Sequence, residues 1–227
     1  MLWAIVLGSG IFLAIRYVHS RRAWPDGEWL VLWPVLSQYV LCLWIAIQAP
    51  RRLADDKQSG ALELLLCTPI QPGEIVRGSM RILRRRFGRA MAALVALDAF
   101  IFFAHFSKYG GWRRGGYDEL FPLAIYALVV FPVQGYSLAR IGLYEGLVRS
   151  NSVRATFMAI WKVGLLPWVL FIGFLMTWDA IRSHFRVLPN IGEQVAFASW
   201  AGAHLLPCGV FLAHASWRLH RNFRSLA

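Results

Sequence analysis

The hydrophobic positions of this chain fall into long unbroken runs, separated by shorter stretches that carry most of the charge. A transmembrane helix needs about 20 mostly apolar residues, and long runs without alternation favour helices over the strands of a barrel. The pattern predicts an all-α, polytopic membrane protein with six transmembrane helices. The predicted spans are Leu2–Val18, Trp29–Ala49, Ala90–Phe106, Leu120–Leu138, Ala159–Thr177 and Val195–Ala215.

The composition agrees with a membrane protein. Of the 227 residues, 58% are hydrophobic and only 16% are charged, and the mean hydropathy is +0.49. No repeat or low-complexity linker interrupts the chain, so we expect a single transmembrane domain over residues 1–227. The first span has no basic region before it and no small-residue cleavage site after it, which predicts a retained helix rather than a signal peptide.

The net charge of +12 comes from basic residues that flank the spans. This distribution favours membrane lipids as partners and argues against nucleic acid, which would select one basic patch. The segment between the second and third spans holds nine basic residues: Arg51, Arg52, Lys57, Arg77, Arg81, Arg84, Arg85, Arg86 and Arg89. The positive-inside rule therefore places this segment and both termini in the cytoplasm, although Arg16, Arg21 and Arg22 favour the reverse orientation for the first span.

The segment between the second and third spans, at about residues 50–88, has the features of a helix, a tight break and a second helix that runs on into the third span. Gly60 is expected to break or bend a helix that begins near Arg51. Pro69 disfavours helical geometry at Thr68, and Pro72 suits the first turn of the next helix. We expect a rigid elbow at the inner membrane face. On physical grounds alone, an amphipathic helix lying on the membrane with its leucines in lipid is an alternative.

The order of residues in this elbow resembles the cytoplasmic signature of type-2, exporter-like permeases of the ATP-binding cassette (ABC) family. In that signature an acidic residue, a glycine, a Leu-Glu-Leu-Leu run and a Thr-Pro pair precede a transmembrane helix. The matching residues are Asp56, Gly60, Leu62, Glu63, Leu64, Leu65, Thr68, Pro69, Glu74, Ile75 and Gly78. The chain departs from the family pattern at Ala61, where threonine is usual, and at Ser79, where lysine is usual. A polar turn at residues 150–155 resembles the start of the fifth helix in these permeases.

The resemblance implies a function and a set of partners. It implies the permease subunit of an ATP-driven exporter in a bacterial inner membrane, with the elbow received as a coupling helix by a separate ABC ATPase. A second permease subunit, identical or related, would complete the transport path. The rival interpretation is a membrane scaffold or accessory subunit that moves no substrate. Substrate-stimulated ATPase activity, or water access to Asp98, distinguishes the two.

Enzyme motifs are missing from the sequence. The chain has no G-x-x-x-x-G-K-[ST] phosphate loop, no H-E-x-x-H and no G-x-S-x-G. We therefore expect no catalytic site, no metal and no cofactor, with ATP bound by the partner. A membrane enzyme assembled from Asp98, His105 and His204 is the remaining alternative, and no spacing supports it.

Polar residues inside the predicted spans are costly in lipid and normally face protein or water. Asp98 is either a pathway or gating contact or a packing carboxylate that is protonated or paired. We expect His204 to hydrogen-bond between helices. Arg140, Glu145 and Lys162 are expected to extend their charges to the membrane interface. Several glycines and prolines within the spans are expected to allow close packing or kinks: Gly135, Gly164, Gly173, Pro132 and Pro167.

Overall fold

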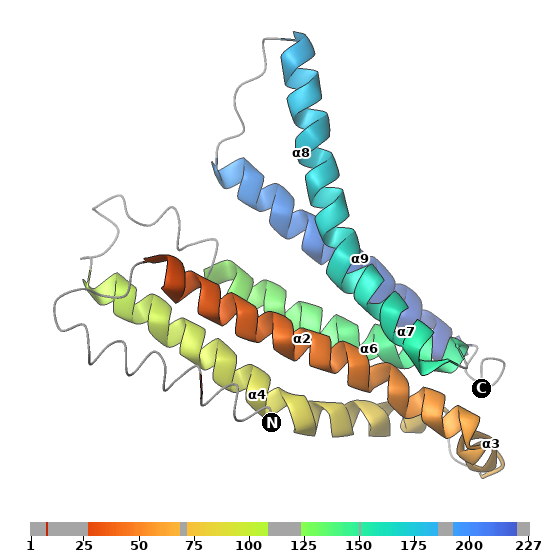
Figure 1. Cartoon of the computed structure of the whole chain (residues 1–227). Coiled ribbons are helices and arrows are strands. Elements are labelled where there is room, and N and C mark those ends of the chain that lie inside the picture. The colour runs from red at the N-terminus through yellow and green to blue at the C-terminus, as the bar shows by residue number, and fades with distance from the viewer. Residues whose placement is uncertain are drawn as a thin grey trace. The chain divides into compact units, whose positions relative to one another are not determined.

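A computed structural model describes residue 8 and residues 27–68, 72–108, 124–149, 151–185 and 193–221, and every regular element within them is helical. This confirms the predicted all-α class. Figure 1 shows the helices, which are α2 (Gly27–Gln58), α3 (Ala61–Leu66), α4 (Pro72–Lys108), α6 (Phe131–Val148), α7 (Ser152–Ile160), α8 (Leu166–Phe185) and α9 (Glu193–Arg221), with π-helical segments η2 (Tyr126–Val130) and η3 (Trp161–Leu165).

The chain divides into two compact units. One comprises Met1–Ile45 and Ile82–Pro132, and the other comprises Ala46–Arg81 and Val133–Ala227. In the first unit, buried apolar side chains come from α2, α4 and η2; examples are Leu41, Ile45, Leu94, Ile101 and Val130. In the second unit they come from the end of α2, from α3 and from α6 to α9; examples are Leu53, Leu62, Leu143, Ala159 and Leu219.

One stretch among the described residues, Ser152–Ile181, is long and apolar enough to cross a membrane by its length and composition. It has 30 residues, and it contains the predicted fifth span. Only 17% of its most apolar window is buried within the chain, so most of this surface faces outward. The predicted first span lies outside the described residues except for residue 8, and the fourth is described from residue 124 onward.

This apolar stretch passes through α7, η3 and α8 without a break. The Asn151 side chain caps its start, because Asn151 Oδ1 accepts hydrogen bonds from the backbone N–H groups of Val153 at 2.9 Å and Arg154 at 3.3 Å. The polar turn at this position therefore begins α7. Farther along the chain, α9 packs against both η3 and α8 (Figure 1).

Candidate functional site

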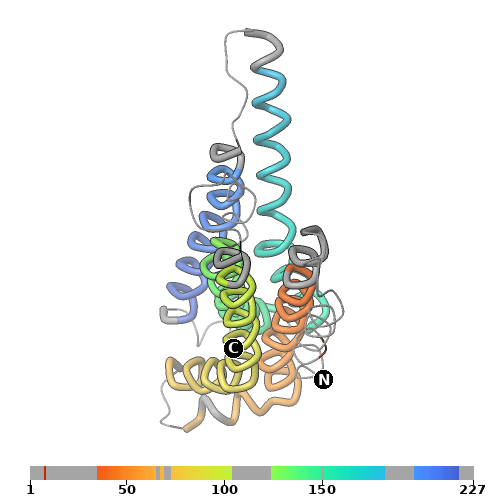
Figure 2. The backbone as a smooth tube through the Cα atoms, turned by 90° about the vertical axis from the view of Figure 1, so that its left-hand side faces the viewer, coloured from red at the N-terminus to blue at the C-terminus, as the bar shows by residue number. Residues whose placement is uncertain are grey.

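The elbow lies in the second unit, where the chain leaves α2, passes through α3 and enters α4 (Figure 2). α2 ends at Gln58, and Gly60 has a φ of +73°, the left-handed conformation that glycine adopts without penalty. The Gly60 N–H donates to the Lys57 carbonyl at 3.2 Å, and the Gly60 carbonyl accepts from the Leu64 N–H at 3.2 Å. One glycine therefore ends one helix and starts the next, which confirms the predicted break.

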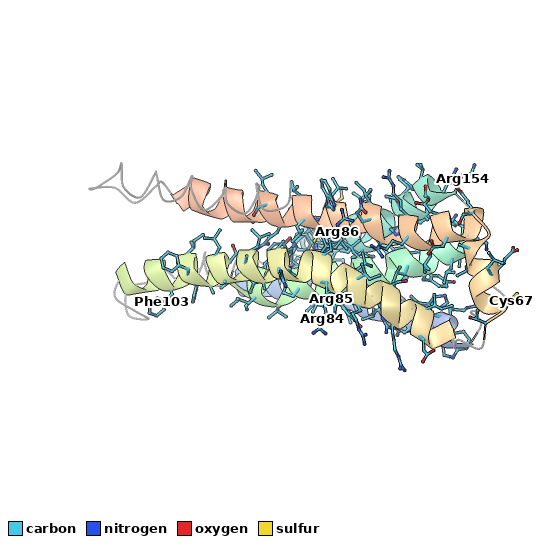
Figure 3. The ribbon with its side chains drawn as sticks, turned by 90° about the horizontal axis from the view of Figure 1, so that it is seen from below. Cys67, Arg84, Arg85, Arg86, Phe103 and Arg154 are labelled. Carbon is cyan, nitrogen blue, oxygen red and sulfur yellow. The ribbon has the colours of Figure 1, made fainter. Side chains whose placement is uncertain are left out.

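α3 is a short helix with a buried side and an exposed side. Leu62 is fully buried, whereas Glu63 and Leu64 are exposed, Leu64 by 73%. Cys67 follows on the connection to α4 and is exposed (Figure 3). Thr68, the next residue, is exposed as well. The elbow thus exposes one acidic and one apolar side chain, Glu63 and Leu64, while the buried Leu62 packs α3 against the rest of the second unit.

The other residues of the signature flank α3. Asp56 is exposed, and its carbonyl accepts a hydrogen bond from the Ser59 hydroxyl at 3.2 Å. Glu74 and Gly78 are exposed on the first turns of α4, and Ile75 is half-buried. α4 begins at Pro72, as predicted. The side chain of Leu65 and the whole of Pro69 lie outside the described residues.

A single lysine connects the elbow to α6. Lys57, in the last turn of α2, donates a hydrogen bond from Nζ to the Leu147 carbonyl at 3.1 Å. This carbonyl belongs to the last turn of α6, where backbone acceptors lack helical partners and the helix dipole attracts a positive charge. The end of α2 and the end of α6 are therefore joined at this point.

The same end of α6 crosses α2 at very short range. A Cβ on Gly146 would lie 2.3 Å from the Pro50 carbonyl oxygen, and a Cβ on Gly142 would lie 2.8 Å from Ala49 Cβ. The spacing of these glycines is the small-xxx-small pattern that lets membrane helices approach closely. The sequence therefore contained a signal for close packing at Gly142 and Gly146. Close packing was instead expected at other glycines, among them Gly164 and Gly173. Gly173 has no neighbour within 4 Å of an added Cβ among the described residues.

Glu145 is the centre of a buried ion-pair network. Its side chain is 2% exposed. Arg149 Nε donates to Glu145 Oε2 at 2.9 Å, and Lys162 Nζ, from η3, donates to Glu145 Oε1. Lys162 Nζ also lies 5.5 Å from the ring centre of Phe211 on α9. Glu145 and Lys162 were expected to reach for the membrane interface. That expectation is wrong, because each satisfies the other's charge inside the second unit.

Two further polar contacts hold α6 to its neighbours. Gln134 Nε2 donates to the Val163 carbonyl at 3.2 Å, which gives a partner to a backbone oxygen of the π-helical segment. Arg140 Nη1 donates to the Ser216 hydroxyl on α9 at 2.6 Å, so this arginine also is paired within the protein instead of extending to the interface. α6 is thus linked to the elbow at one end and to η3 and α9 along its length.

The two polar residues considered for the transport path lie in different surroundings. Asp98 is buried on α4 and accepts a hydrogen bond from Gln38 Nε2 on α2, within the first unit. His204 is buried on α9, and its Nδ1 lies 3.0 Å from the Trp200 carbonyl of the same helix. Its contact across helices is aromatic, edge to face with Trp168 at 5.4 Å, so the expected hydrogen bond between helices is not formed among the described residues.

The comparisons with known proteins identify no relative: no family model, no curated protein and no solved structure matches the chain. Among the described residues, no group of His, Cys, Asp and Glu side chains is arranged to hold a metal ion. The candidate site is therefore the elbow together with the polar contacts that hold it to α6.

Proposed function

We propose that this chain is the transmembrane permease subunit of an ATP-driven ABC exporter, and that α3 is the coupling helix received by a separate ATPase subunit. The observation that carries the proposal is the build of α3. It is a short helix set apart by Gly60, anchored by Leu62, and it presents Glu63 and Leu64 outward. A solvent-exposed leucine beside a carboxylate suits a partner's groove lined by apolar and basic groups. The buried Leu62 holds these two side chains in place.

The helices on either side of α3 support a membrane role. α2 has 32 residues and α4 has 37, and they contain the predicted second and third spans, Trp29–Ala49 and Ala90–Phe106. We propose six spans in a bacterial inner membrane, with the elbow and both termini in the cytoplasm. The exposed apolar side chains of α8, such as Leu170, Ile172 and Met176, then face lipid or a second permease subunit.

The experiment that tests the proposal compares two matched double variants. Glu63→Lys with Leu64→Ser alters the outward face of α3, whereas Arg154→Glu with Val153→Ser reverses a charge and removes an apolar side chain at exposed positions of α7. Each tagged full-length chain is purified in mild detergent from its native membrane. We expect an ATPase with a G-x-x-x-x-G-K-[ST] loop to co-purify with wild type and with the α7 variant, and its yield to fall at least about tenfold with the α3 variant.

The outcomes separate the proposal from its rivals. Equal recovery of the ATPase with all three proteins would show that α3 is not the coupling helix. Failure of any such ATPase to co-purify with wild type would reject the permease function. Binding of the ATPase at α3, with no stimulation of its activity by any candidate substrate, would instead favour the scaffold.

The cytoplasmic position of the elbow is tested by Cys67. Of the three cysteines, Cys67 is exposed, while Cys42 and Cys208 are buried. We expect a membrane-impermeant maleimide to label inverted membrane vesicles strongly and right-side-out vesicles weakly, and Cys67→Ser to abolish the labelling. Labelling of Cys67 from the outer side would place the elbow outside the cell, where it could not meet an ATPase.

A further inference from the structure

The first unit contains a buried carboxyl group that is built differently from Glu145. Asp98 on α4 is 8% exposed, and its partner Gln38 on α2 is 1% exposed. Gln38 Nε2 donates a hydrogen bond to Asp98 Oδ2. Two oxygens of this pair, Gln38 Oε1 and Asp98 Oδ1, are buried and have no hydrogen-bond partner among the described residues.

The oxygen of the Gln38 amide is always an acceptor, and Asp98 Oδ1 is also an acceptor, with no proton to donate, when the carboxyl group is ionised. A carboxylate buried without a countercharge is strongly disfavoured, and an amide oxygen buried without a donor adds a further cost. If Asp98 were ionised, Gln38 Oε1 and Asp98 Oδ1 would thus both be buried acceptors without a donor. A proton on Asp98 is the simplest explanation for both unpaired oxygens.

The groups around the pair supply no positive charge. No described lysine, arginine or histidine forms an ion pair with Asp98, in contrast to Glu145, which has Arg149 and Lys162. The titratable neighbours in this cluster are Tyr39 and Cys42 on α2 and Tyr126 in η2. The rings of Tyr39 and Tyr126 stack with their centres 6.4 Å apart. Among the described residues, the surroundings of Asp98 are therefore without a countercharge and rich in tyrosine.

We propose that Asp98 and Gln38 form a proton-binding site that joins α2 to α4. The ligand is one proton, carried by Asp98 Oδ1, which then donates to Gln38 Oε1 while Gln38 Nε2 donates to Asp98 Oδ2. This reciprocal pair satisfies both unpaired oxygens and leaves no net charge between the helices. Opening the contact to water would favour the ionised carboxylate, so separation of α2 from α4 is linked to release of the proton. The inference does not depend on the ATPase partner.

Infrared spectroscopy of the full-length chain in lipid nanodiscs tests the site directly. At neutral pH we expect a carbonyl stretching band of a protonated carboxylic acid that shifts in D2O and also shifts when aspartate is labelled with 13C. The band should disappear in Asp98→Asn and persist in Glu145→Gln. Absence of an aspartate-derived acid band from wild type, or its persistence in Asp98→Asn, would overturn the proposal. Absence of the band from labelled wild type rejects the site even if a variant does not fold, and its assignment to Asp98 among the six aspartates comes from Asp98→Asn.

A second measurement distinguishes the neutral acid from a carboxylate that binds a cation or a charged substrate. Asparagine is neutral and can donate from its amide to Gln38 Oε1, so it reproduces the bonds of the protonated acid. We expect the melting temperature of Asp98→Asn in detergent to match wild type within error, and that of Asp98→Ala to fall. Equal losses for Asn and Ala would show that the negative charge itself is required and would reject the proton site.

Discussion

Replacing Gly146 with alanine should destabilise the protein by more than about 3 kcal/mol, above the usual range for an overpacked site. The new methyl group would lie 2.3 Å from the Pro50 carbonyl oxygen and 3.1 Å from Pro50 Cα. These are backbone atoms, so no side-chain rotation can relieve the clash, and α2 must move away from α6. The measurement is the melting temperature of the purified chain in detergent, together with the yield of monodisperse protein.

Two other glycines calibrate this result. Gly142→Ala should have a smaller effect, because its methyl group would meet Ala49 Cβ at 2.8 Å and side-chain atoms of Pro50 beyond it. Gly209→Ala, with no neighbour within 4 Å of its added Cβ among the described residues, should be neutral or slightly stabilising, since alanine favours the helix. If Gly146→Ala melted at the same temperature as Gly209→Ala, the close crossing of α2 and α6 would be wrong.

Neutralising Glu145 should cost about 3 kcal/mol, the lower end of the range for breaking a buried ion pair. Glu145→Gln leaves Lys162 and Arg149 together without their carboxylate. The expected loss lies at the lower end because the side chains of Lys162 and Arg149 keep 23% and 33% of their surface exposed, where water screens their charge. The free energy of unfolding by denaturant or heat, compared with wild type, measures the effect.

A double variant shows whether the loss comes from the Glu145–Lys162 pair. Glu145→Gln combined with Lys162→Met removes both charges, and methionine keeps the length that packs near Phe211. We expect the double variant to be more stable than Glu145→Gln alone, whereas Arg154→Gln, at an exposed position of α7, should change little. Additive losses for Glu145→Gln and Lys162→Met would mean that the two side chains do not interact.

The parts of the fold that depend on neighbouring residues could be predicted from the sequence. Gly60 ends α2 and Pro72 begins α4, because the backbone preferences of glycine and proline act over one or two residues. Asn151 caps α7 for the same kind of reason. Long apolar runs correctly indicated helices throughout the described residues, since helical periodicity and length are properties of the local chain.

The contacts that join separate helices could not be predicted in this way. Glu145 on α6 and Lys162 in η3 are 17 residues apart, with the end of α6 and the whole of α7 between them, so no single helical spacing brings them together. Gln38 and Asp98 are 60 residues apart, and Lys57 reaches a carbonyl 90 residues away. A charged residue in an apolar run indicates that burying it costs free energy. Which residue pairs with that charge depends on how the helices pack.

The π-helical segment η3 has a consequence for how this chain tolerates length changes. A π turn accommodates one residue more than an α turn, so it acts as a single-residue insertion within α7 and α8. Deleting one residue from Trp161–Leu165 would remove this insertion and restore an α turn, so the faces of α7 and α8 would keep their directions. The edge-to-face contact of Trp168 with His204 should therefore survive the deletion. Deleting one residue from a regular α turn of α8 would instead rotate everything beyond it by about 100°, and a different stripe of α8 would meet α9.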